Sequence, residues 1–467
     1  MLKKILIANR GEIACRIART CKRLGIPAVA VYSDADAGAP HVALAGEAVR
    51  IGPPPVKDSY LSIPAVIDAA KSTGATAIHP GYGLLSENQA FAEAAAAAGL
   101  VFIGPPPSVL SAFGDKIRAR QVARSAGVLP PPGSEGPIAV DDGEALLREA
   151  ERIGFPLLVK AAGGGGGIGM QIVETPGTLA RAATACSDRG RSAFGDPRVY
   201  MERYIRSPRH IEVQVLCDAF GGAVALGERE CSVQRRHQKI IEETPSPAAF
   251  FQGEEGEARR QALFAAALRV VTAAGYVNAG TVEFVADEAG HLYFLEVNAR
   301  LQVEHCVTEM CTGLDLVEQQ IRVAAGERLA PEVLSAPRRG ASIEARVYAE
   351  NPAKKFIPQP GKLAKLVWPE GADDLRVETG VTEGLEVTPF YDPLLAKIVA
   401  HGATRREAIE RLDRALAQTT IELVGPAGPA ATNLEFLRKV LASPEFASGT
   451  YDTLLAEALA KQPSAKG

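Results

Sequence analysis

The sequence predicts a protein of mixed α/β and α+β class with two to four domains, and three observations carry this prediction. Apolar segments alternate with helical segments over the first 114 residues, which is typical of a parallel sheet. Five consecutive glycines, at 163–167, follow an apolar strand that ends in Lys160. From residue 210 onward, strand-like segments follow one another with a single long helix between them, which favours an antiparallel sheet.

The first unit, residues 1–114, is built from short strands and helices. Residues 3–9 predict a buried strand, and the helix after it ends at Gly25. The alternation continues with a strand at 27–33, a helix at 64–73, a strand at 76–79 and a helix at 88–98. The first turn holds one glycine, Gly11, which counts against a dinucleotide-binding site because such a site needs several glycines there.

The second unit, residues 115–334, contains the glycine run. A linker rich in proline and glycine at 129–137 precedes a compact segment, about 131–204, which we expect to be a mobile lid. The glycines would let backbone N–H groups close over an anion, and Lys160 would add a positive charge. The strands predicted after the lid lie at 210–218, 222–230, 280–287 and 291–298, around a helix at 257–274.

The third unit, residues 335–445, is predicted to hold three strands before a helix. The strands lie at 341–350, 361–369 and 394–402, and the helix at 404–417. We assign residues 446–467 to a C-terminal tail, and expect its last residues, KQPSAKG, to be disordered.

Composition excludes several classes of function. The formal net charge is −4, and no basic stripe with interleaved aromatic residues occurs, which argues against nucleic acid as a partner. No apolar run approaches 18 residues, so no membrane span is predicted. The seven cysteines form no CxxC pair, which is typical of reduced thiols in a cytoplasmic protein.

Carboxylates on two neighbouring strands suggest a metal site. The two-residue period places Glu283 on one face of its strand, and places Phe294, Glu296 and Asn298 together on one face of the next. Such oxygen ligands suit Mg²⁺ bound with nucleotide phosphates. Solvated strand carboxylates are an equally open reading of the spacing. An unpaired carboxylate is costly in the apolar strand around Glu296, which favours the metal.

Two polar segments leave alternatives open. The run Arg235, Arg236, His237 and Lys239 lies between apolar strands, and either lines an anion site or forms a solvated face. In NARLQVEHCVTE (298–309), a carboxylate beside an arginine and a metal would suit a general base. Helix capping or a plain ion pair explains that segment equally well.

Eight ordered blocks together resemble one family, biotin carboxylase, the ATP-grasp component of biotin-dependent carboxylases. The resemblance covers residues 2–445, and the blocks are ILIANRGEIACRI, AIHPGYGLLSEN, KAAGGGGGIGM, RHIEVQV, QRRHQKIIEE, GTVEFV, LEVNARLQVEH and PFYDPLLAKI. It implies a Rossmann-like N-terminal domain, an ATP-grasp core with a mobile lid, and a biotin carboxylase C-terminal domain.

The resemblance also implies the role of each site residue. The residues it assigns to ATP are Lys116, Lys160, Gly166, Gly167, Glu202, Arg203, Tyr204, Ile205, His210, Gln234, His237, Glu283 and Glu296. The implied ligands of two Mg²⁺ or Mn²⁺ ions are Glu283, Glu296 and Asn298. The implied bicarbonate site is Lys239, Arg300, Gln302 and Val303. Glu304 is the implied general base, Arg346 the residue that stabilises the biotin enolate, and Tyr82 a neighbour of biotin.

The chain departs from the family pattern at a few positions. Ile168 stands where most members have Lys or Arg, which would weaken the lid's hold on phosphate. Cys306 replaces a common proline beside Glu304, and is expected to loosen that turn. The segment 424–437 is longer and richer in proline and glycine than usual.

The sequence lacks a biotin-acceptor motif, which bears on the expected partners. The four methionines stand at 1, 170, 201 and 310, so no Met-Lys-Met biotin acceptor occurs, and we expect biotin on a separate carrier protein. Carboxyltransferase subunits, a homodimer and membership of acetyl-CoA carboxylase are the other implied associations. The rivals are an ATP-grasp ligase for a different carboxylate and a non-catalytic nucleotide-binding subunit.

Overall fold

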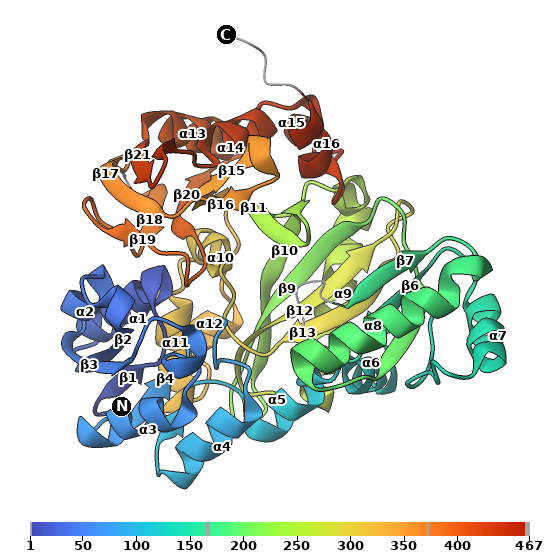
Figure 1. Ribbon diagram of the computed structural model, residues 1–467, viewed down its shortest axis with the longest axis horizontal. Coiled ribbons are helices and arrows are strands. Elements are labelled where there is room, and N and C mark those ends of the chain that lie inside the picture. The colour runs from blue at the N-terminus through green and yellow to red at the C-terminus, as the bar shows by residue number, and fades with distance from the viewer. Residues whose placement is uncertain (1, 164–168, 371–372, 463–467) are drawn as a thin grey trace.

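The computed structural model describes residues 2–163, 169–370 and 373–462. Its first unit is a five-stranded parallel sheet in the order β3-β2-β1-β4-β5, flanked by helices (Figure 1). The strands are β1 (Ile5–Ile7), β2 (Ala28–Ser33), β3 (Gly46–Gly52), β4 (Ala77–His79) and β5 (Val101–Phe102). The helices are α1 (Gly11–Arg23), α2 (Pro40–Leu44), α3 (Ile63–Ser72), α4 (Gln89–Ala97) and α5 (Pro107–Gly114). Strand β3 was not predicted, because this edge strand leaves most of its residues partly or fully exposed.

A small three-stranded unit projects from the body of the molecule in Figure 1, where the sequence predicts the lid. Its sheet has the order β7-β6-β8 and is antiparallel, and its apolar core is separate from that of the rest of the chain. Its elements are α7 (Gly143–Ile153), β6 (Leu157–Ala161), β7 (Met170–Val173), α8 (Leu179–Phe194) and β8 (Val199–Arg203). Gly166, Gly167 and Ile168 lie outside the described residues.

An eight-stranded antiparallel sheet forms the centre of the molecule, in the order β13-β12-β9-β10-β11-β14-β20-β18. Its strands are β9 (Arg209–Cys217), β10 (Ala223–Arg235), β11 (Gln238–Thr244), β12 (Asn278–Ala286), β13 (Leu292–Asn298), β14 (Ala341–Tyr348), β18 (Leu375–Thr379) and β20 (Leu394–Gly402). Helix α9 (Gly253–Ala273) packs on it. Because β11 pairs with β14, the predicted second and third units share one sheet.

The C-terminal part of the chain contains a further, four-stranded sheet in the order β19-β17-β21-β22, together with several helices. These are β17 (Gly361–Val367), β19 (Glu386–Val387), β21 (Thr420–Gly425), β22 (Gly428–Ala430), α13 (Arg405–Gln418), α14 (Leu434–Leu441), α15 (Pro444–Ser448) and α16 (Leu455–Lys461). The predicted tail needs a correction, because Phe446, Leu455 and Leu459 are buried in one core with Leu437. Among the described residues, no helix is long and apolar enough to cross a membrane.

Candidate active site

One large cavity, of about 1170 Å³, collects the residues that the sequence singled out. It is bordered by the parallel domain, the three-stranded unit, the central sheet and the C-terminal part. Every predicted site residue that the structure describes lines it: Tyr82, Lys116, Lys160, Glu202, Arg203, Tyr204, Ile205, His210, Gln234, His237, Lys239, Glu283, Glu296, Asn298, Arg300, Gln302, Val303, Glu304 and Arg346. These residues come from segments up to 264 positions apart, from Tyr82 to Arg346.

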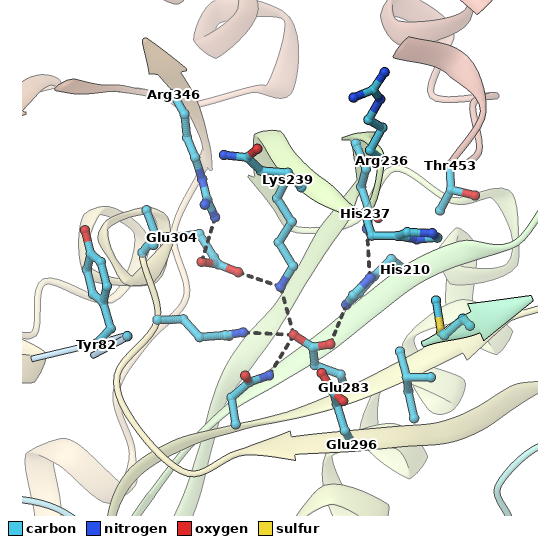
Figure 2. A pocket seen from close by; sticks show the side chains of 18 of the residues that line it. Tyr82, His210, Arg236, His237, Lys239, Glu283, Glu296, Glu304, Arg346 and Thr453 are labelled. Atoms are coloured by element: carbon cyan, nitrogen blue, oxygen red, sulfur yellow. Dashed lines mark hydrogen bonds and ion pairs between the residues drawn. The ribbon is translucent and has the colours of Figure 1, made fainter. Parts of the chain in front are cut away.

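Lys239 of β11 lies between three carboxylates, and Figure 2 shows its contacts with two of them, Glu283 and Glu304. Its ammonium nitrogen is 2.6 Å from Glu212, 2.9 Å from Glu283 and 2.7 Å from Glu304. Burial alone would lower the pKa of Lys239, but the acidic groups around it outweigh burial and raise that pKa well above its ordinary value. Lys239 is therefore a permanent cation, able to exchange a carboxylate for another anion.

Glu212 was missed by the sequence analysis, although a signal for it was present. It lies two residues after His210 on β9, so both side chains point from the same face of the strand. Its register partner on the next strand is Glu283 of β12. Glu212 is fully buried, and a buried carboxylate needs charged partners, which Lys239 and Arg229 supply.

The predicted face of β13 needs a correction. Glu283 is opposite Glu296, but the next residue of β12, Phe284, is opposite Phe294, so Leu295 is an extra residue in β13. This β-bulge turns Phe294 away from Glu296 and into the apolar core. Leu295 and Glu296 both line the cavity, which strict alternation does not allow.

The carboxylate of Glu283 is saturated with hydrogen-bond donors (Figure 2). Its Oε1 atom accepts bonds from Lys239 (2.9 Å), Asn298 (2.9 Å) and Gln302 (2.8 Å), and its Oε2 lies 3.0 Å from Nε2 of His210. Burial alone would raise the pKa of Glu283, but Lys239 and His210 hold it well below its ordinary value. This permanently ionised group is a suitable ligand for a hard cation.

Two further lysines of the cavity are also paired with carboxylates. Asp115 caps helix α6 (Lys116–Ser125) by accepting bonds from two backbone N–H groups, so Lys116 occupies the first helical position and reaches Glu296. Lys160, near the end of β6, lies 2.8 Å from Glu202, which Arg120 also contacts at 2.7 Å. The side chain of Glu202 is thus buried between two cations.

A two-residue hairpin turn places His237 at the edge of the cavity. Strands β10 and β11 are joined through Arg236 and His237, whose φ angles are +47° and +66°. Paired left-handed residues match the twist of a hairpin, although glycine or asparagine is the usual choice there. Of the basic run, Arg236, His237 and Lys239 line the cavity, whereas Arg235 is buried and paired with Glu350.

Glu304 bridges Lys239 and Arg346 (Figure 2). Its two oxygens lie 2.7 Å from the Lys239 ammonium and 3.0 Å from the Arg346 guanidinium, and Arg346 also contacts Glu242. Burial alone would raise the pKa of Glu304, but Lys239, Arg346 and Arg229 together hold it well below its ordinary value. Glu304 is therefore an ionised carboxylate between two cations.

Arg300 lines the cavity but is turned toward other partners. Its guanidinium donates to Glu87 (2.9 Å), Asn298 (2.9 Å) and the Leu301 carbonyl (3.2 Å). Glu87 is 213 positions away in the sequence, so no local pattern could reveal this pair. Within the part of the chain that the structure describes, the guanidinium of Arg300 forms no hydrogen bond or ion pair with Glu304.

The far end of the cavity joins three parts of the chain. Tyr82 of the parallel domain donates to Glu12, and the ammonium of Lys397 on β20 lies 3.2 Å from the same carboxylate. Lys397 also donates to the Val303 carbonyl at 2.6 Å. Cys306 does not prevent helix α10 (His305–Thr312) from forming beside Glu304, since a thiol fits the first turn where proline is also accepted.

The C-terminal residues also reach the cavity. Thr453, Leu454 and Glu457 line it beside His237, and the Thr453 N–H donates to the Pro208 carbonyl at 3.0 Å. The sequence placed these residues in the tail, because the apolar positions of α16 are few and no motif marks them.

Three family models match consecutive parts of the chain: the N-terminal domain of biotin carboxylase at 1–110, the ATP-binding domain of carbamoyl-phosphate synthase L chain at 115–332, and the C-terminal domain of biotin carboxylase at 344–458. The chain is 49% identical to biotin carboxylase 2 of Bacillus subtilis (strain 168), over 97% of this chain and 98% of that protein. The chain belongs to the biotin carboxylase family.

Two further relatives show the breadth of the biotin carboxylase family. The mitochondrial methylcrotonoyl-CoA carboxylase subunit alpha of Oryza sativa subsp. japonica is 48% identical, and the match covers 97% of this chain but 60% of that subunit. The biotin carboxylase domain dimer of Hydrogenobacter thermophilus 2-oxoglutarate carboxylase, solved with MgADP, ADP and bicarbonate, superimposes with a TM-score of 0.92 at 41% identity, covering 99% of this chain and all of that one.

These matches confirm the predicted three-part architecture and the class of enzyme. The protein is an ATP-dependent ligase of the ATP-grasp type, built as a Rossmann-like domain, an ATP-grasp core and a biotin carboxylase C-terminal domain. The matches do not distinguish among acyl acceptors, because relatives with different acceptors are similarly close.

Proposed function

We propose that this biotin carboxylase uses ATP and bicarbonate to carboxylate biotin on a separate carrier protein, and that the resulting carboxyl group passes to acetyl-CoA. The observation that carries the reaction is the position of Glu304, which touches Lys239 with one oxygen and Arg346 with the other. A base is thereby placed between a cation suited to bicarbonate and a cation suited to an enolate.

In the first half of the proposed reaction, Lys239, Gln302 and the backbone of Val303 hold bicarbonate, and Glu304 removes its proton. A bicarbonate oxygen then attacks the γ-phosphorus of ATP, which gives carboxyphosphate and ADP. Lys116 and Lys160, which lie at the nucleotide end of the cavity, offset the phosphate charge. Arg300 would have to leave Glu87 to take part, because its guanidinium is held there.

In the second half, carboxyphosphate breaks down to CO₂ and phosphate inside the cavity. The phosphate takes the proton of the biotin ureido nitrogen, and Arg346 stabilises the enolate oxygen that forms. The nitrogen then attacks CO₂, which gives carboxybiotin. Tyr82 lies at this end of the cavity, where it is held by Glu12 and would pack against the biotin ring.

The residues proposed for the two divalent ions fit hard cations. Glu283 is permanently ionised, Glu296 lies opposite it across the β12–β13 pair, and Asn298 adds an amide oxygen. Mg²⁺ or Mn²⁺ bound there would supply neutralisation of phosphate charge. Each carboxylate would first have to give up contacts that it now makes. Glu283 contacts Lys239, Asn298, Gln302 and His210, and Glu296 contacts Lys116.

The proposed partners are a biotin carboxyl carrier protein, carboxyltransferase subunits and a second copy of this chain. The match to biotin carboxylase 2 of Bacillus subtilis, which covers 98% of that protein, supports a separate carrier. The dimeric biotin carboxylase domain of the Hydrogenobacter relative supports a homodimer. A cytoplasmic location remains a prediction.

The reaction is tested by following ADP release from the purified protein with and without bicarbonate and free biotin, and by trapping labelled carboxybiotin. We expect ADP release to require bicarbonate, and carboxybiotin to require both substrates. ADP release that is independent of bicarbonate but stimulated by another carboxylate would identify a different ATP-grasp ligase. Absence of turnover with intact ATP binding would identify a non-catalytic subunit.

A further inference from the structure

Arg229 of β10 is buried beneath the bicarbonate end of the cavity, and no motif drew attention to it. Its exposed fraction is 0%, and it is the largest fully buried side chain among the described residues. Arginine carries five N–H donors, and here all three nitrogens have acceptors. Those acceptors are Glu212 at 2.5 Å, Gln214 at 2.6 Å, Gln302 at 2.8 Å, Thr281 at 3.0 Å and Thr308 at 3.1 Å.

Arg229 determines which way the amide of Gln302 faces. A guanidinium can only donate and an ionised carboxylate can only accept. The amide of Gln302 lies between one of each, with Oε1 2.8 Å from Arg229 and Nε2 2.8 Å from Glu283. If the amide rotated by half a turn, both contacts would be mismatched, because the NH₂ group would face the donor Arg229 and the oxygen would face the acceptor Glu283. The NH₂ group is therefore directed toward Glu283, which lines the cavity, and within the described residues Glu283 is its one side-chain acceptor, which leaves a second N–H to donate to an anion.

Arg229 also supports the lysine of the same site. Glu212 accepts from Arg229 with one oxygen and from Lys239 with the other, at 2.5 and 2.6 Å. Arg229 thus holds the carboxylate of Glu212 in place, and Glu212 in turn holds the ammonium of Lys239. Gln302 and Lys239, two of the proposed bicarbonate ligands, are held from one buried point.

We infer that Arg229 is a positioning residue for bicarbonate, acting mainly through the amide of Gln302. This inference rests on the proposed role of Gln302 in bicarbonate binding. Apolar residues of similar size can often replace a buried ion pair without loss of stability. The stability of the core alone therefore gives little reason for a buried guanidinium at position 229. Its geometry instead serves two groups of the anion site at once.

Arg229→Lys is the informative substitution. Lysine keeps the positive charge for Glu212, but its single ammonium lacks the planar fork that reaches Gln302 at the same time. Loss of one hydrogen bond changes affinity roughly two- to tenfold, so the KM for bicarbonate should rise by about that factor in bicarbonate-dependent ADP release. The KM for ATP should change less than twofold. A general loss of structure would instead raise the KM for both substrates.

A double-mutant cycle with Gln302→Met tests the route of action. If Arg229 acts through Gln302, Arg229→Lys should have little further effect on the bicarbonate KM once Gln302 is methionine. The matched control is Thr308→Val, which removes another Arg229 acceptor that does not line the cavity. It should leave the bicarbonate KM unchanged.

The outcomes separate this inference from the proposed function. If Gln302→Met leaves the bicarbonate KM unchanged, the proposed bicarbonate site is wrong. If Gln302→Met raises that KM but Arg229→Lys does not, or if the two effects multiply, the role of Arg229 is overturned.

Should Arg229→Lys fail to fold, Arg229→Gln combined with Glu212→Gln removes both charges together. A rise in the bicarbonate KM that exceeds the rise caused by Glu212→Gln alone supports the inference, and an equal rise overturns it.

Discussion

Replacing Arg346 with serine should separate the two halves of the reaction. Arg346 contacts Glu304 at 3.0 Å, but Glu304 keeps its second contact, with Lys239 at 2.7 Å. Loss of one hydrogen bond to a charged group costs about 1.5–3 kcal/mol, so removing Arg346 should raise the pKa of Glu304 from its present low position. Since its pKa is now well below 4.5, Glu304 should still be ionised near neutral pH.

Bicarbonate-dependent ATP cleavage by Arg346→Ser should therefore persist, within roughly tenfold of the unaltered enzyme at neutral pH. Carboxybiotin formation should fall by about 10²–10³, the usual effect of removing a donor to a developing oxyanion. The acid limb of ATP cleavage should also move to higher pH, because the carboxylate form of Glu304 is lost as pH falls through a pKa that the substitution raises. ADP release and trapped label are measured on the same samples.

Glu304→Gln is the matched comparison, since it removes the base but keeps the size of the side chain. It should lose bicarbonate-dependent ATP cleavage altogether. Arg346→Ser leaves Glu242 without its cation, so the fold of each variant is checked by thermal unfolding. Equal loss of both activities in a folded Arg346→Ser enzyme would refute this division of roles.

Four further outcomes are expected. Glu296→Gln should lower Mg-ATP turnover by roughly 10²-fold or more, since a metal ligand supplies several kcal/mol, while thermal unfolding is unchanged; near-normal turnover would remove Glu296 from the metal site. Purified protein should carry no covalent biotin, and a streptavidin-reactive band of the correct mass would contradict a separate carrier. Amide hydrogen exchange in β6 and β7 should slow when ATP is added, and unchanged rates at saturation would show that the three-stranded unit does not close. Mg²⁺ alone should give no measurable binding heat, and tight binding without nucleotide would show that the paired carboxylates are already available.

Much of the site was predictable because its residues follow local rules. Lys239 was singled out as part of a basic run between apolar strands. Glu283 stands in a strand whose apolar neighbours mark it as buried, and a buried charge needs a partner. The same alternation could have revealed Glu212, two residues after His210. The ordered motifs then supplied the roles of these residues, which spacing alone left open.

The remaining features depend on contacts between distant segments. The β-bulge at Leu295 arises from pairing with β12, and reverses the face that simple alternation assigns to Phe294. Arg300 meets Glu87 only because the parallel domain packs against the loop after β13. Leu454 reaches the cavity because α16 packs against the central core. That short helix has too few apolar residues to be predicted from the sequence.

The pairing of charges in the free site explains why its substrates are expected to bind together. Lys116 touches Glu296 in a pair that is partly exposed. Lys160, Lys239 and Arg346 each touch a carboxylate in a largely buried ion pair, so an anion that replaces one of these carboxylates has to break such a pair. Breaking such a pair is costly when one partner is left without compensation. If the proposed roles hold, ATP and divalent cations together would remove that cost, because phosphate oxygens would take the place of the carboxylates beside the lysines and Glu283 and Glu296 would be available to hold the cations. The free protein thus holds the cations of the cavity in contact with carboxylates that include the proposed metal ligands, so the charges of these groups offset one another before any substrate binds.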